Sequence, residues 1–103
     1  MYRIIEGRGT GKTSRLMLLV KENNGILVCE NPYAMRVKAH AYGLNDLEII
    51  SYNDYHNEDY DLDKPCFIDE LECYVRFLGG NLNGYTLSIE DWLKNEIWKY
   101  KSI

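Results

Sequence analysis

The sequence has little that would indicate a secreted, membrane or metal-cluster protein. Its three cysteines, Cys29, Cys66 and Cys73, are an odd number and show no paired C-x-x-C spacing, so we expect reduced, largely buried thiols. No apolar segment is long enough to cross a bilayer, and no secretory signal pattern is present. These features predict a cytoplasmic protein without a membrane partner.

The chain also lacks an excess of basic residues. It has 12 Lys and Arg against 16 Asp and Glu, a formal net charge of -4. A surface that follows a nucleic-acid backbone normally carries an excess of positive charge, so general nucleic-acid binding is disfavoured. Local basic patches remain open: Arg36 and Lys38 could touch a partner or simply form a solvated helix face. With 103 residues and no linker or repeat, we predict a single domain, 1–103.

Three of the eight glycines, Gly7, Gly9 and Gly11, lie in one short run near the N-terminus. Residues Tyr2 to Ile5 are predicted to form a strand, and Glu6-Gly7-Arg8-Gly9-Thr10-Gly11-Lys12-Thr13 follows at the start of an amphipathic helix. This is the setting of a phosphate-binding loop, in which glycines let successive N–H groups point at a phosphate. Glu6 stands where the usual pattern has a glycine, so we interpret the loop as a variant. The alternative is a glycine-rich turn that only caps the helix.

Specific roles follow for the residues of this loop. Lys12 would contact the β- and γ-phosphates, and Thr13 would hold Mg²⁺. The predicted nucleotide-binding residues share the loop and the first turn of the helix; they are Gly7, Gly9, Thr10, Gly11, Lys12, Thr13 and Ser14.

A second motif lies downstream, where a brief apolar strand ends in two acids. Cys66-Phe67-Ile68 is followed by Asp69 and Glu70. At the carboxyl end of a strand beside a phosphate loop, Asp69 could orient Mg²⁺, and Glu70 could polarise an attacking water. Many buried strands end in solvated acids, so this motif alone is a weak indication of a metal site. Together with the glycine-rich loop it becomes a strong one.

At these residues the chain resembles the P-loop NTPases, in the division with an additional catalytic glutamate that includes RecA-like ATPases, helicases and phage packaging motors. The form Gly-Arg-Gly-Thr-Gly-Lys-Thr is most similar to the loops of phage terminase and small phage or prophage ATPases. The resemblance implies that Arg8 acts on the γ-phosphate together with Lys12. It also implies that the segment after Pro32 touches DNA or a neighbouring subunit, and that Ser88 senses the γ-phosphate, although Ser88 could equally cap the last helix.

Alternation of apolar and turn segments predicts an α/β fold. We expect strands at 2–5, 26–29, 47–52, 66–68 and 85–87, helices at 13–22, 32–42, 71–78 and after Ser88, and a long irregular connection at 53–64. Joined by parallel crossovers, these elements predict a three-layer α/β/α sandwich with a mainly parallel five-stranded sheet. Of the nine tyrosines, Tyr52, Tyr55 and Tyr60 could stack on bases, but half-buried packing is the favoured interpretation.

The sequence therefore predicts binding of a nucleoside triphosphate, with ATP and Mg²⁺ as cofactors, and slow hydrolysis in a phage- or mobile-element-related process acting on nucleic acid or a protein partner. A non-catalytic binding or inhibitor protein with a vestigial nucleotide site is the alternative. A small-molecule kinase is a third possibility, although no arginine-rich lid is present. Since so small a core leaves the phosphates open, we also expect self-assembly or a partner, with Arg36 or Arg76 supplied across the interface.

Overall fold

The structure is a computed structural model that describes residues 2–7 and 9–86. The chain divides into two compact units, one formed by Met1–Lys12 with Asn83–Ile103 and the other by Thr13–Leu82. Each unit is described by itself below. Of the residues that the structure describes, those in regular secondary structure lie almost entirely in the larger unit, and the glycine-rich loop lies in the smaller one.

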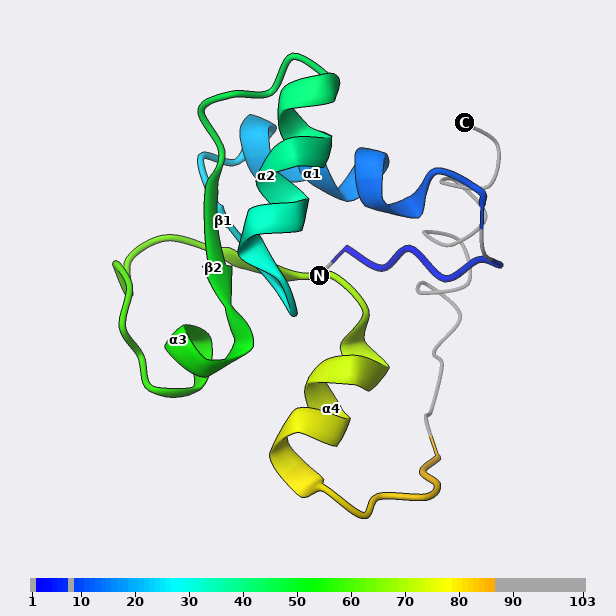
Figure 1. The fold of residues 1–103 in the computed structure, drawn as a ribbon. Helices are drawn as coiled ribbons and strands as arrows, with labels where there is room; N and C mark the ends of the chain where they lie inside the picture. The colour runs from blue at the N-terminus through cyan, green and yellow to red at the C-terminus, as the bar shows by residue number, and fades with distance from the viewer. Residues whose placement is uncertain (1, 8, 87–103) are drawn as a thin grey trace. The chain divides into compact units, whose positions relative to one another are not determined.

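Helices and strands alternate along the described chain (Figure 1). In order, the elements are α1 (Lys12–Glu22), β1 (Ile26–Cys29), α2 (Pro32–Ala41), β2 (Glu48–Ser51), α3 (Tyr52–His56), β3 (Cys66–Ile68) and α4 (Leu71–Gly79). The predicted strands at 26–29 and 66–68 are confirmed, as are the helices that follow the glycine-rich loop, Asn31 and Glu70.

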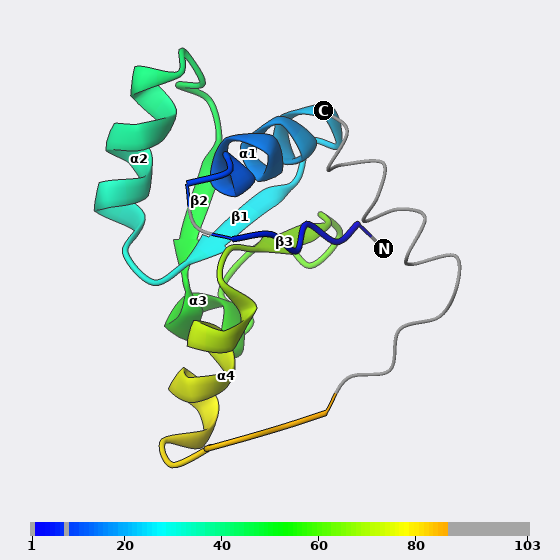
Figure 2. The ribbon, with the colours of Figure 1, turned by 90° about the vertical axis from the view of Figure 1, so that its right-hand side faces the viewer.

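The three strands form one parallel sheet in the order β2-β1-β3 (Figure 2). Ile26 pairs with Glu48 on one side and with Cys66 on the other, so β1 is the central strand. All four residues of β1 are buried, whereas β2 and β3 are only partly covered. The carboxyl ends of all three strands therefore meet at one edge, as expected for a parallel arrangement.

The predicted five-stranded sheet is wrong, because the sheet formed by the described residues has three strands. Residues 2–5 contain no strand, and neither do Tyr85 and Thr86, while Leu87 lies outside the described residues. Tyr2 and Ile5 are 47% and 50% exposed, so this short apolar run is not buried as a core strand would be. Strand formation depends on a pairing partner and on burial, which a local apolar run does not specify.

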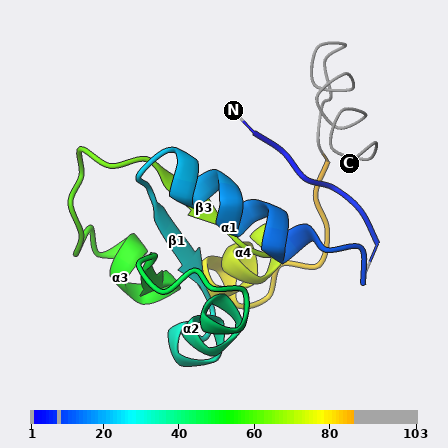
Figure 3. The ribbon, with the colours of Figure 1, turned by 90° about the horizontal axis from the view of Figure 1, so that it is seen from above.

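Side chains of β1 alternate between two hydrophobic clusters, one on each face of the sheet. Leu27 and Cys29 pack with Met17 of α1 and Met35 of α2. Ile26 and Val28 pack instead with aromatic residues from α3 and its neighbours; this second cluster includes Tyr52, Tyr55, Tyr60 and Tyr74. Figure 3 gives the view in which α1 passes across the sheet. Helices on both faces explain why a four-residue strand is fully buried.

Local signals explain where α2 begins and ends. The Asn31 side chain accepts a hydrogen bond from the Ala34 amide at 3.1 Å, and Pro32 occupies the first helical turn. Gly43 follows the helix with a φ of 76°, a left-handed conformation that favours glycine. These caps confirm the sequence-based prediction for this helix.

The predicted irregular connection at 53–64 is wrong at its start, because α3 occupies Tyr52–His56. Ser51 caps this helix by accepting a hydrogen bond from the Asp54 amide at 3.1 Å. The acidic residues of the segment suggested a loop, but burial of Tyr52 and the Ser51 cap stabilise one helical turn. The helix predicted after Ser88 lies outside the described residues.

Candidate functional site

The glycine-rich loop is closed by two hydrogen bonds to one carbonyl. The Thr10 hydroxyl and the Lys12 ammonium group each donate to the Gly7 carbonyl, both at 2.9 Å. Gly9 and Gly11 have φ angles of 76° and 80°, which residues with a Cβ rarely adopt. The Lys12 ammonium group is thus hydrogen-bonded to a neutral acceptor of its own loop. A phosphate oxygen is a stronger acceptor for an ammonium group than a carbonyl is. Arg8 lies outside the described residues.

Within the larger unit, the structure brings together the two predicted metal-binding residues. Thr13 is the second residue of α1, and Asp69 directly follows β3. The Thr13 hydroxyl donates to Oδ1 of Asp69 at 3.2 Å, although the residues are 56 positions apart in sequence. The Asp69 amide donates to the Val28 carbonyl at 2.9 Å, which extends the β1–β3 pairing by one residue. Asp69 is therefore anchored by the sheet itself.

The oxygen atoms of Thr13 and Asp69 fit a magnesium ion carried by a nucleotide. Mg²⁺ takes oxygen ligands, keeps several waters, and is usually held by one or two carboxylates together with substrate phosphates. Among the described residues there is no cluster of three or more His, Cys, Asp or Glu side chains that could hold a metal without a substrate. One hydroxyl and one carboxylate suit an ion whose remaining ligands are phosphate and water.

Glu70, the predicted water-polarising residue, occupies a strained turn between β3 and α4. Its φ and ψ angles are 58° and 70°, a left-handed conformation for a residue that is not glycine. Its side chain is exposed and does not cap α4, although Glu70 is the N-cap residue. Left-handed non-glycine residues persist only where surrounding contacts impose them, and they are frequent at functional sites.

The contact that holds this turn comes from Tyr52, whose role the sequence did not reveal. Its hydroxyl donates to the Asp69 carbonyl at 2.8 Å and lies 3.2 Å from the Glu70 carbonyl. The side chain is 4% exposed, and its ring meets the Tyr74 ring edge to face at 5.3 Å. Burial raises the pKa of Tyr52 above its ordinary value, so the hydroxyl, protonated at neutral pH in any case, remains a hydrogen-bond donor. The available signal was its position as the last residue of the predicted strand 47–52, at the carboxyl end.

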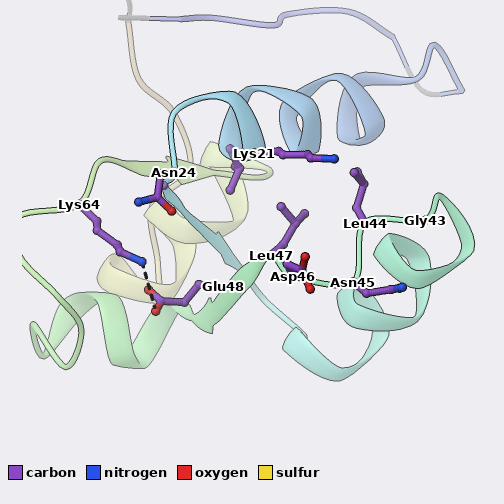
Figure 4. A pocket seen from close by; sticks show the side chains of 11 residues that line it. Lys21, Asn24, Gly43, Leu44, Asn45, Asp46, Leu47, Glu48 and Lys64 are labelled. Atoms are coloured by element: carbon purple, nitrogen blue, oxygen red, sulfur yellow. Dashed lines mark ion pairs between the residues drawn. The ribbon is translucent and has the colours of Figure 1, made fainter.

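Two hollows lie at opposite ends of the strands. A cavity of about 140 Å³ at the carboxyl ends is lined in part by Glu30, Lys38, Asp69 and Glu70. A larger one of about 250 Å³ is lined by residues near the amino ends, including Lys21, Asn24, Leu47, Glu48 and Lys64 (Figure 4). There the Lys64 ammonium group pairs with Glu48 at 4.0 Å. Ligands of open parallel sheets bind at the carboxyl ends, which favours the smaller hollow as part of the site.

Cys29 lines the smaller hollow but is not a reactive thiol. It is 2% exposed, and its sulfur contacts the Ile50 carbonyl at 3.9 Å. Burial, aided by the negative charge of Asp69, raises the pKa of Cys29 to about 11. Because the thiolate is the nucleophilic form, the thiol is inert at neutral pH and belongs to the core.

The other predicted site residues lie on α1, α2 and α4 or outside the described residues. Ser14 is half-buried in the first turn of α1. An Arg36 guanidinium nitrogen lies 3.5 Å from the Ile49 carbonyl, so this side chain links α2 to β2. Arg76 is exposed in the last turn of α4. Ser88 lies outside the described residues.

Within residues 2–7 and 9–86, no helix combines the length and apolar character needed to cross a bilayer. Searches against protein families, curated proteins and solved structures each found no match to this sequence.

Proposed function

We propose that this protein binds a magnesium–nucleoside triphosphate, with ATP as the nucleotide, and hydrolyses it slowly. The observation that carries the proposal is the hydrogen bond between Thr13 and Asp69. It joins a hydroxyl that follows the glycine-rich loop to a carboxylate at the end of a parallel strand. Such a pair supplies the two protein oxygens that a nucleotide-bound Mg²⁺ needs.

Different residues of the chain would bind the phosphates, hold the metal and activate water. Lys12 would leave the Gly7 carbonyl for the phosphates, where a charge-assisted hydrogen bond replaces a neutral one. Arg8 and Lys12 would stabilise negative charge that develops on the γ-phosphate. Thr13 and Asp69 would hold the metal, which neutralises phosphate charge when bound. Glu70 would orient water and accept its proton.

The wider role that we propose follows from the resemblance to phage ATPases. The protein would couple nucleotide binding to a phage- or mobile-element-related process, acting on nucleic acid or a protein partner. A non-catalytic binding or inhibitor protein is the competing function, and turnover separates the two. Self-assembly would cover the phosphates; Arg76, exposed on α4, is better placed to serve a neighbour than Arg36, which contacts its own β2.

Calorimetric titration with ATP, in Mg²⁺ and in EDTA, tests the nucleotide site. Lys12→Ala should weaken Mg-ATP binding at least about tenfold, because a charge-assisted phosphate contact contributes roughly 1.5–3 kcal/mol. Lys21→Ala is the matched control, since Lys21 lies in the last turn of the same helix and should bind like wild type. Equal affinities of wild type and Lys12→Ala would refute the phosphate-binding loop.

Phosphate release measured over a range of protein concentrations tests hydrolysis and assembly together. Specific activity that rises with protein concentration, or with added DNA, supports an assembled ATPase. Tight Mg-ATP binding without turnover under every condition would leave the binding protein as the function.

A further inference from the structure

We propose that Tyr52 is a positioning residue for the candidate metal site, holding the Asp69–Glu70 turn so that the Asp69 carboxylate meets Thr13. This inference rests on the proposed function. Tyr52 touches neither phosphate nor metal in this scheme; it acts through the backbone of the two acidic residues.

The backbone of Asp69 is held from two directions. Its amide donates to the Val28 carbonyl of the central strand, and its carbonyl accepts from Tyr52 at 2.8 Å. The peptide plane before Asp69 is thereby held by β1, and the plane after Asp69 is held by α3. A side chain whose backbone is anchored on both sides loses little entropy when it binds a ligand.

The hydroxyl also compensates for the strain at Glu70. A phenol has one proton, so the 2.8 Å contact to Asp69 is the stronger bond and the 3.2 Å contact to the Glu70 carbonyl is the weaker. The Glu70 carbonyl also accepts from the Cys73 and Tyr74 amides, which ties the turn to the first turn of α4. Without the Tyr52 hydroxyl, the left-handed residue would be free to relax and to carry Asp69 with it.

Tyr52 itself is rigidly placed. It begins α3, directly after the Ser51 cap, and its ring packs against Tyr74 at 5.3 Å and Phe77 at 6.0 Å. Both partners belong to α4, so the aromatic ring stabilises the fold while the hydroxyl acts on the turn. The two contributions can be separated by removing the oxygen atom alone.

The test compares Tyr52→Phe with Tyr74→Phe, each of which deletes one hydroxyl from the same aromatic cluster. ATP affinity is measured in Mg²⁺ and in EDTA, and melting temperatures check the fold. Tyr52→Phe should lose about fivefold in affinity in Mg²⁺, the factor expected from one ordinary hydrogen bond, with no loss in EDTA. Tyr74→Phe should show the wild-type difference between Mg²⁺ and EDTA. A purely structural role would weaken binding equally in both conditions, which would overturn the inference.

A double-mutant cycle with Glu70→Gly gives a second measurement of what the Tyr52 hydroxyl contributes. Glycine adopts the left-handed conformation without strain, so the hydroxyl should matter less in this background. Glu58→Gly is the matched control, since Glu58 is also left-handed, with a φ of 56°. An undiminished effect of Tyr52→Phe in the Glu70→Gly background contradicts the proposed mechanism.

Amide hydrogen exchange of the protein without nucleotide supplies a readout independent of binding. Tyr52→Phe should accelerate exchange in residues 69–74 more than Tyr74→Phe does. If wild type shows no Mg²⁺-dependent ATP binding, the proposed function fails and this inference fails with it. If wild type does show it and Tyr52→Phe matches Tyr74→Phe, the inference alone fails.

Discussion

The Thr13 hydroxyl and the Asp69 carboxylate meet at 3.2 Å at the carboxyl edge of the sheet, where α1 begins and β3 ends. Both side chains are half-buried, and Asp69 is fixed to β1 through its amide. This contact joins the last residue of the first sequence motif to the aspartate of the second. It also makes the metal-binding prediction testable by changing either oxygen alone.

Removal of either oxygen should reduce the contribution of Mg²⁺ to ATP affinity. Thr13→Val keeps the shape of the side chain, and Asp69→Asn keeps its size while removing the charge. Each should cost about 1–3 kcal/mol in Mg²⁺ and little in EDTA. The double variant should cost less than the sum, because the two residues serve one ion. Strict additivity in calorimetric titrations would show that the residues act independently.

Glu70→Gln should separate nucleotide binding from turnover. The amide keeps the size of the side chain but cannot accept a proton, so ATP affinity should persist while phosphate release falls about 10²-fold or more. Glu72→Gln, two residues along in the first turn of α4, is the matched control and should keep its activity. Undiminished turnover in Glu70→Gln would remove this residue from the catalytic step.

Gly25→Ala should destabilise the larger unit. A Cβ at this buried position would lie 2.7 Å from both Phe67 Cε1 and the Pro65 carbonyl oxygen. One of these contacts is backbone, so relief requires movement of the chain before β3, at a cost of about 1–3 kcal/mol. Gly84→Ala meets nothing within 4 Å and should be nearly neutral. Urea unfolding measures the stability of both variants. Equal unfolding midpoints for Gly25→Ala and Gly84→Ala would contradict the close packing at Gly25.

Stability should fall with rising pH in the alkaline range because of Cys29. Its pKa is raised from 9.0 to about 11 in the folded protein. Below pH 9 the thiol is protonated in both states, so its full contribution is present. Between pH 9 and 11 only the unfolded state loses the proton, so the free energy of unfolding falls by up to about 1.4 kcal/mol per pH unit.

Urea unfolding at pH 8, 9 and 10 measures this decrease, with Cys29→Ala as the comparison. The variant lacks the thiol and should lose less stability over the same range. A decrease of the same size in both proteins would assign the alkaline effect to other groups.

The sequence by itself determined the features that depend on neighbouring residues. The glycine-rich run, the Asn31 and Pro32 helix start and the strand that precedes Asp69 were all recognisable, because glycine-rich turns, caps and short apolar strands are encoded within a few positions. The core strand Ile26–Cys29 was equally clear from its continuous apolar character.

Only the tertiary structure decided which segments pair and which side chains meet. The apolar run Tyr2 to Ile5 looked like a strand but forms none, since a strand exists only where another offers its hydrogen bonds. The acidic segment 53–64 looked like a loop and Tyr52 like the end of a strand, yet burial of Tyr52 and the Ser51 cap make residues 52–56 helical. The Tyr52 hydroxyl reaches Asp69 and Glu70 across 17 and 18 positions, and Thr13 reaches Asp69 across 56. Contacts over such separations follow from how helices pack on the sheet, which no local pattern contains.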